Sequence, residues 1–173
     1  HRYALLEHGD KAFEELRRLT KINCWHRAQY ESDAMWQLYA GKSKGVAILS
    51  TPSRIAAAAE PFRLQPEYGH EDLWAGDVRY LDLLKVRLRA SMLHRFWYKH
   101  AAFSWEREFR LAISLRTAEE YAVPVPAEGI KVKFDAQKLV HRIFIGPLVP
   151  RSDEQAVREA AATTGLAECI RIS

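Results

Sequence analysis

Hydrophobic and polar positions fall into short blocks along the chain, and the period of each block predicts one element of secondary structure. Alternation with a period of two is typical of strands, and recurrence every three or four residues is typical of helices. The alternating or wholly apolar blocks predict strands at residues 22–26, 46–49, 77–82, 106–114, 130–134, 141–145 and 169–172. The helical blocks begin at Asp10, at Ser32 or Asp33, at Thr51, at Leu84, at Asp135 and at Ser152. Residues 62–76 hold few periodic apolar positions and are predicted to form a loop.

Capping residues mark several of the predicted helix starts. Thr51 followed by Pro52 is a strong start, because a hydroxyl caps free backbone N–H groups and proline suits the first helical position. Asp135 can cap a short helix in the same way. Ser152 and Gln155 have the spacing of a capping box.

The irregular order of these elements predicts the fold class. Strands and helices mix without a regular alternation, which favours an α+β fold over a doubly wound parallel sheet. With no internal repeat or flexible linker, we expect one domain over residues 1–173, with a mixed, mostly antiparallel sheet flanked by helices. The first residue is His1 and the sequence begins close to a helix, so we expect an N-terminal segment to be missing.

Composition places the chain among soluble globular proteins. Apolar residues make up 48% and charged residues 28% of the 173 positions, which is ordinary for a folded domain. No apolar stretch approaches the roughly 20 residues needed to cross a bilayer, and no secretory leader is recognisable. Cys24 and Cys169 lie in segments predicted as buried strands and form no C-x-x-C pair. We therefore expect a cytoplasmic protein with no membrane partner.

Positive charge gathers in one segment, although the formal net charge is only +4. The apolar positions Leu84, Leu88, Met92 and Phe96 recur every fourth residue and predict a helix over residues 84–102. No acidic residue stands between Asp82 and Glu106. The basic residues of that interval are Lys85, Arg87, Arg89, Arg95 and Lys99, interleaved with aromatic residues. Cations with aromatic rings suit a nucleotide or a nucleic acid. The alternative is that these cations are the solvent-exposed side of a half-buried helix.

The predicted strand after Trp105 carries the most suggestive polar pattern. A period of two places Glu106, Glu108 and Arg110 on one face, opposite a mostly apolar face. Carboxylates one pleat apart, roughly 7 Å, repel each other unless a cation or ligand lies between them. Such a pair can raise its own pKa for general acid–base work, or bind a sugar hydroxyl. The alternative is an exposed strand face with an ionic ladder.

Two further clusters combine polar and aromatic residues. His26 and Arg27 stand where a predicted strand runs into a loop, followed by Tyr30 and, in the next helix, by Tyr39. Ser50, Thr51 and Arg54 stand at a predicted helix start, where free N–H groups favour an anion. A structural histidine and a plain helix cap are the alternatives.

Several kinds of site are disfavoured by missing motifs. The histidines and cysteines show no H-x-H, H-E-x-x-H or C-x-x-C spacing, so we expect no metal site. The chain also lacks G-x-S-x-G, the P-loop motif and G-x-G-x-x-G, which disfavours triad hydrolases, P-loop NTPases and Rossmann enzymes.

Three strings together resemble a bacterial family catalogued as domain of unknown function 2971. They are C-W-H-x3-Y-E-S-x2-M-W-x2-Y from Cys24, G-V-A-I-x-S-T from Gly45, and R-F-x2-K-x3-F-x2-E-x-E-x-R from Arg95 to Arg110. The resemblance covers residues 20–173. It implies a fold and an additional N-terminal segment, but little chemistry, so function has to be argued from the site.

The order of the polar clusters is also similar to that of NAD-dependent ADP-ribosyltransferases. Those proteins use an arginine or histidine on an early strand, a Ser-Thr element, and a later Glu-x-Glu. The matching positions here are His26 or Arg27, Ser50 with Thr51, and Glu106 with Glu108. The resemblance implies that Glu108 polarises the ribose of NAD and that Glu106 orients the acceptor. The cofactor-binding residues would be His26, Arg27, Tyr30, Tyr39, Ser50, Thr51, Arg54 and Arg110.

Three hypotheses follow. The first is an ADP-ribosyltransferase-like or NAD glycohydrolase-like domain of the toxin or phage-defence type, with NAD as cofactor and no metal. The second is an RNA- or DNA-binding module or metal-independent nuclease that uses Lys85, Arg87, Arg89, Arg95 and Lys99. The third is a non-enzymatic interaction domain. The first requires that Glu106 and Glu108 face inward beside His26 and Arg27.

Overall fold

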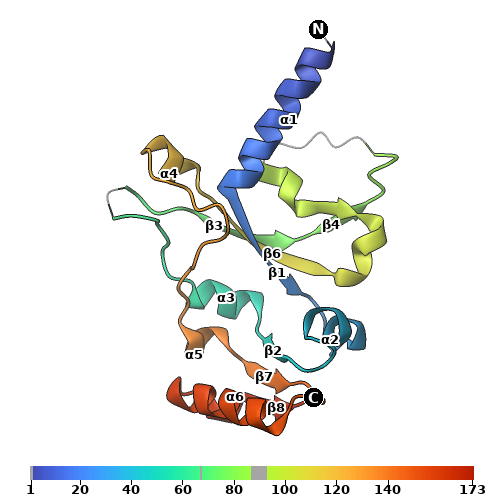
Figure 1. Cartoon of the computed structure of the whole chain (residues 1–173), viewed down its shortest axis with the longest axis vertical. Coiled ribbons are helices and arrows are strands. Elements are labelled where there is room, and N and C mark those ends of the chain that lie inside the picture. Colours follow the sequence, from blue (N-terminus) through green and yellow to red (C-terminus); the bar gives the residue numbers. More distant parts are fainter. Residues whose placement is uncertain (1, 67, 87–92) are drawn as a thin grey trace. The chain divides into compact units, whose positions relative to one another are not determined.

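The computed structural model describes residues 2–66, 68–86 and 93–173, and the side chains of residues 2–10 and 93 are outside that description. The chain clusters into two compact units (Figure 1). Unit 1 comprises residues 1–28 and 61–131, and unit 2 comprises residues 29–60 and 132–173. Helices and strands mix in an α+β fold, and most of the described strand pairs are antiparallel, as the sequence predicts.

Unit 1 is built on a three-stranded antiparallel sheet in the order β1-β6-β3. Helix α1 (Arg2–Leu19) leads directly into β1 (Thr20–His26), which pairs with the central strand β6 (Glu108–Ser114). Strand β3 (Leu73–Asp77) pairs with the other edge of β6. Strands β4 (Arg79–Leu81) and β5 (Tyr98–His100) form a separate parallel pair. The remaining elements are the 3-10 helices η1 (Leu93–Trp97) and η2 (Ala101–Glu106) and the helix α4 (Arg116–Glu120).

The central strand β6 has two faces of opposite character. Leu111 and Ile113 on one face are buried, and Leu115, just beyond the strand, has no exposed surface. Glu108, Arg110, Ala112 and Ser114 stand on the other face, because successive side chains of a strand point to opposite sides. The apolar face holds the sheet in place, and the polar face is left for the side chains that form the candidate site.

Unit 2 has its own sheet and core. Strands β2 (Val46–Leu49), β7 (Arg142–Ile145) and β8 (Ile170–Ile172) form a sheet in the order β2-β7-β8. Its helices are α2 (Asp33–Tyr39), α3 (Pro52–Ala58), α5 (Ala136–Leu139), α6 (Arg151–Thr163) and the 3-10 helix η3 (Ala167–Cys169). Ala161 of α6 packs with Ile143 and Ile145 of β7 in one buried cluster, so α6 covers this sheet.

The capping signals in unit 2 gave good predictions at three of four helices, and at α2 the cap is Ser32, whose hydroxyl accepts from the N–H of Met35. Thr51 caps α3 and Asp135 caps α5, each through its side-chain oxygen. The prediction for Ser152 is wrong, because α6 begins at Arg151 and Gln155 hydrogen-bonds to Glu159 instead of closing a capping box.

Other boundaries differ from the predictions because pairing between distant segments decides them. The predicted loop 62–76 contains the start of β3, which is fixed by pairing with β6. The helix predicted to begin at Asp10 begins at Arg2. Of the predicted strand 130–134, only Phe134 makes a bridge, to Ala59. Cys24, predicted to be buried, is exposed.

The predicted helix over residues 84–102 is wrong where the structure describes it. A 3-10 helix covers Leu93–Trp97, and Tyr98–His100 pairs with β4 as a strand. Leu84, which opened the predicted apolar stripe, is almost fully exposed. Residues 87–92 lie outside the described part. Aromatic residues favour strands, and pairing with β4 outweighs the helical spacing.

No helix within the described residues is both long and apolar enough to span a bilayer.

Candidate functional site

Antiparallel pairing of β1 with β6 brings His26 close to the two glutamates, Glu106 and Glu108. His26 lies directly opposite Glu108, and Cys24 lies opposite Arg110. Directly opposed residues project from the same face of an antiparallel pair. The Nδ1 atom of His26 lies 2.7 Å from the backbone oxygen of Glu106, so the ring is anchored at the turn between the two glutamates.

Glu106 and Glu108 converge by a route that differs from the predicted alternation along one strand. Glu106 is the last residue of η2, and β6 begins only at Glu108. Between them Arg107 adopts a left-handed conformation with φ 45° and ψ 52°. Its carbonyl accepts a hydrogen bond of 2.9 Å from the backbone N–H of Arg27, which fixes the turn against the end of β1. The prediction that Glu106 belongs to the strand is therefore wrong, although the two carboxylates share one cation.

That shared cation is Lys99, from the strand β5. Its Nζ donates to Glu106 and lies 2.7 Å from Oε1 of Glu108. The Nε of Arg110 donates to the other oxygen of Glu108, at 2.5 Å. Only 6% of Glu106 and 7% of Glu108 is exposed. Two buried carboxylates are thus balanced by two cations, which burial of charge requires.

The cations keep Glu108 ionised. Burial alone would raise the pKa of Glu108, but hydrogen bonds from Arg110 and Lys99 hold this pKa far below its ordinary value. Burial likewise opposes the charge of Lys99, yet the two glutamates raise the pKa of its ammonium. Glu108 therefore does not have the raised pKa that would suit it to proton transfer. It offers a fixed negative charge.

Arg27, the other member of the predicted corner, turns away from this cluster. Its guanidinium pairs with Asp77 at the end of β3, and both side chains are more than half exposed. Exposed pairs of this kind contribute about 0–1 kcal/mol to stability. Arg27 therefore contributes only a backbone hydrogen bond to the turn at Arg107, while its side chain keeps an accessible positive charge.

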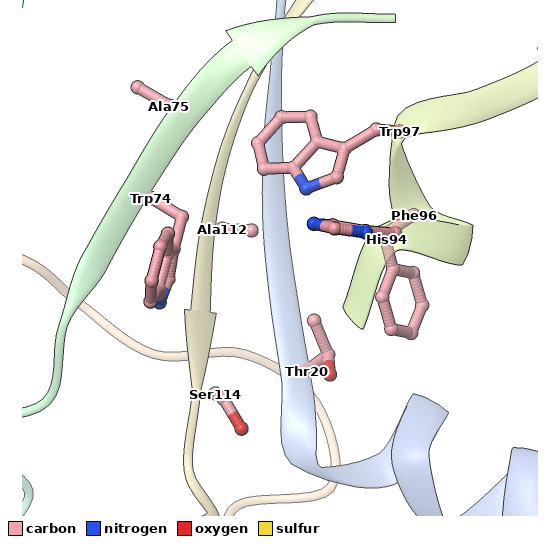
Figure 2. A pocket seen from close by; sticks show the side chains of 8 residues that line it. All are labelled: Thr20, Trp74, Ala75, His94, Phe96, Trp97, Ala112 and Ser114. Atoms are coloured by element: carbon pink, nitrogen blue, oxygen red, sulfur yellow. The ribbon is translucent and has the colours of Figure 1, made fainter. Parts of the chain in front are cut away.

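A cavity of about 220 Å³ opens on the same face of the sheet as Glu108. Figure 2 shows its walls, which come from β1, β3, β6 and η1 and are lined by Thr20, Trp74, Ala75, His94, Phe96, Trp97, Ala112 and Ser114. Ala112 and Ser114 follow Glu108 and Arg110 on one face of β6. Arg110 joins the two regions, since its Nη1 donates to the carbonyl of Phe96 while its Nε donates to Glu108.

Sequence reasoning missed most of this cavity. Trp74 lies in a segment predicted as loop, and Thr20 was not singled out. Phe96 and Trp97 belonged to a predicted helix that is not formed. The available signal was the continuation of the period-two pattern through Ala112 and Ser114, whose small side chains leave room above the sheet.

The remaining predicted cofactor-binding residues belong to unit 2. The hydroxyl of Thr51 caps α3 through the N–H of Arg54, and the hydroxyl of Ser50 donates to the carbonyl of Leu139. The guanidinium of Arg54 donates to carbonyls of three residues at the end of α5, namely Gln137, Leu139 and Val140. These groups are therefore bonded within unit 2. Tyr30 is 83% exposed, and Tyr39 is also exposed.

The basic segment proposed for nucleic acid is partly occupied by internal contacts. Lys85 pairs with Asp82, and the guanidinium of Arg95 lies 5.6 Å from the centre of the Phe13 ring. Lys99 is held between the two glutamates and lies over the ring of Phe103. Arg87 and Arg89 lie outside the described residues. Among the described cations of this segment, Lys99 is held by two buried glutamates, whereas Lys85 and Arg95 are exposed.

Within residues 2–66, 68–86 and 93–173, no group of three or more histidine, cysteine, aspartate or glutamate side chains is placed to hold a metal ion. Comparison of the chain with family models, with curated proteins and with solved structures gives no match. The resemblances to the family of unknown function and to ADP-ribosyltransferases stay predictions, and the function has to be argued from the geometry of the site.

Proposed function

We propose that unit 1 binds NAD and cleaves its bond between nicotinamide and ribose, in the manner of an ADP-ribosyltransferase or an NAD glycohydrolase. One observation carries the proposal: Glu108 is buried, held ionised by Arg110 and Lys99, and lies opposite His26 on the sheet face that also carries an aromatic cavity. A fixed carboxylate in a water-poor site is the group that such a reaction needs. A toxin or defence role would follow from consumption of cellular NAD.

The chemistry explains why a low pKa suits Glu108. The bond between C1 of the ribose and the ring nitrogen breaks heterolytically, and its electron pair leaves with neutral nicotinamide. Positive charge develops on the ribose, and a nearby ionised carboxylate stabilises it. A carboxylate has about four acceptor positions, so Glu108 can bind a ribose hydroxyl while it keeps its two cations. Water or another nucleophile then attacks C1 of the ribose, forms a bond to it and loses one proton.

Lys99 and Arg110 act in this scheme as positioning residues. They hold Glu108 from both of its oxygens, so the carboxylate needs no reorganisation when the charge develops. Glu106 is held by the same ammonium, and in this scheme it orients the attacking nucleophile.

The direct test measures release of nicotinamide from NAD by the purified chain. Glu108→Gln keeps the shape of the side chain and removes its charge, so we expect turnover to fall about 100- to 1,000-fold. Glu128→Gln removes an exposed carboxylate of the same unit and serves as the matched control, with unchanged turnover. Circular dichroism checks that both variants are folded. Turnover by Glu108→Gln equal to that of the unaltered chain would overturn the proposal.

The nucleic-acid hypothesis has less support, because the described basic side chains of its segment are paired or stacked. It predicts binding of short RNA that weakens steeply with salt, since counterion release dominates such affinity. The interaction-domain hypothesis predicts that the acidic cluster only stabilises the fold. In that case neither NAD nor RNA binds.

A further inference from the structure

The cavity on the polar face of β6 has walls that are mainly aromatic. Figure 2 shows the indole rings of Trp74 and Trp97 and the rings of His94 and Phe96 around one space. Its volume of about 220 Å³ is smaller than the roughly 300–1,000 Å³ of pockets for drug-sized ligands. It can therefore hold one ring system but not a whole dinucleotide.

Small side chains on the sheet form the base of the cavity. Ala112 lies opposite Trp74, and Thr20 lies opposite Ser114, all on the face of Glu108. Gly76 lies next along β3, opposite Arg110, where the ring of Trp97 approaches its backbone. The absence of large side chains at these positions leaves the space between the aromatic rings open.

A buried hydroxyl in the wall lacks a partner. Thr20 is 7% exposed, and among the described residues its Oγ1 makes no hydrogen bond. Buried polar groups are nearly always satisfied, and an unmet one destabilises the empty state. The hydroxyl of Ser114 and the imidazole of His94 add polar groups to the same wall. A purely aliphatic ligand would leave these groups unpaired.

We infer that this cavity binds a single planar heteroaromatic ring that carries a carbonyl or amide group, the class that includes nicotinamide and the pyrimidine bases. The ring stacks on the indole faces. In the empty cavity the Thr20 oxygen has almost no accessible surface, so the side chain turns its hydroxyl toward the polar group of the ring when the ring binds. The inference rests on the proposed function in one respect: the ring is taken to be part of the nucleotide that is cleaved at Glu108.

Because Glu108 lies away from the cavity, ring binding in the cavity and NAD cleavage at Glu108 can be tested separately. Glu108 and Ala112 are four residues apart on β6, roughly 13 Å along the strand, with Arg110 between them. A ring with its ribose can reach from one to the other, but a free ring stays within the cavity. Removal of the Glu108 charge should therefore leave the binding of a free ring unchanged.

The experiment titrates the full chain with nicotinamide and with uracil by isothermal calorimetry. Cyclohexanecarboxamide, which carries the same amide on a saturated, puckered ring, is the matched ligand control. We expect saturable binding of the planar rings and none of the saturated one. Equal binding of all three compounds, or binding of none, would overturn the inference.

Two substitutions locate the binding. Ala112→Leu fills the base of the cavity and should weaken ring binding at least tenfold, whereas Ala102→Leu makes the same change at an exposed position of unit 1 and should not. Thr20→Val removes only the unpaired hydroxyl and should weaken binding about three- to tenfold while the chain stays folded. Unaltered binding in both cavity variants would overturn the inference even if one of them were unstable.

The NAD measurement distinguishes failure of this inference from failure of the proposed function. Ring binding that survives in Glu108→Gln, together with NAD cleavage that is lost there, supports both. Ring binding without any NAD cleavage by the unaltered chain supports the cavity and overturns the proposed chemistry. Full NAD cleavage by Ala112→Leu overturns the role of the cavity alone.

Discussion

At the residue scale, the ammonium of Lys99 determines how two acidic side chains can be buried side by side. Its side chain is 26% exposed, and it contacts Glu106 and Glu108 together. Without it, Glu106 would lose its ion pair and Glu108 would keep only its bond to Arg110. Removal of one partner from a buried charge cluster is far more costly than loss of an exposed pair, because the remaining charges stay desolvated.

Lys99→Met should therefore lower the free energy of unfolding by about 3 kcal/mol. Lys85→Met is the matched control, since Lys85 also pairs with an acidic residue but its side chain is 82% exposed. The control should cost less than about 1 kcal/mol. Urea unfolding followed by circular dichroism measures both. Equal losses in the two variants would show that the acidic cluster is not desolvated in solution.

The lowered pKa of Glu108 predicts how stability depends on pH. A carboxyl whose pKa is lower in the folded state adds stability above its unfolded value, here 4.5, and that stability is lost as the pH falls below it. Lys99 and Arg110 have raised pKa values, so their contributions are lost only at strongly alkaline pH. We expect the urea midpoint to stay constant between pH 7 and about 5.5 and to fall below 4.5.

Glu108→Gln should weaken this acid dependence. Asp82 and Asp135 also have lowered pKa values, through hydrogen bonds from Lys85 and from Lys138, so a smaller dependence remains in the variant. If the urea midpoint fell equally steeply with acid in both proteins, the assignment of the charge to Glu108 would be contradicted.

At the scale of single elements, the turn from η2 into β6 is the feature that brings the two glutamates to one cation. Arg107 provides it by adopting a left-handed backbone conformation between them. Most residues with a Cβ atom avoid this region, whereas glycine enters it freely. The strand pair β1–β6 then places His26 at the same end of the sheet.

Substitutions at Arg107 test this turn. Arg107→Gly should leave stability unchanged or raise it by up to about 1 kcal/mol, because glycine fits the backbone conformation. Arg107→Val should lower stability by about 1–2 kcal/mol, because a β-branched residue resists positive φ. Thermal unfolding measures both. If Arg107→Val were more stable than Arg107→Gly, the chain would not adopt the left-handed conformation at this position.

At the scale of the whole molecule, local signals predicted some elements well and distant pairing decided the others. Val46–Leu49, the Thr51 cap and the Asp135 cap could be read from the sequence, because each depends on a few neighbouring residues. The strands β3 and β5 could not, since each exists through pairing with a partner far along the chain.

The candidate site shows the same division. The period-two pattern identified Glu108 and Arg110 as neighbours on one face, and the structure joins them by a hydrogen bond. It misplaced Glu106, because nothing in the sequence marks Arg107 as left-handed. Most of the cavity could not be predicted, since Trp74 and Trp97 meet only through the folding of β3 and η1 onto one sheet.

The melting temperature of the full chain in the presence of NAD tests the central claim most directly. A ligand at a hundred times its dissociation constant stabilises the folded state by about 2.7 kcal/mol, which corresponds to a rise of about 5–11 °C in a protein of this size. We predict such a rise with NAD, no rise with short RNA, and a much smaller one for NAD with Ala112→Leu. A melting temperature unchanged by millimolar NAD would contradict the claim that the buried carboxylates and the aromatic cavity form a nucleotide site.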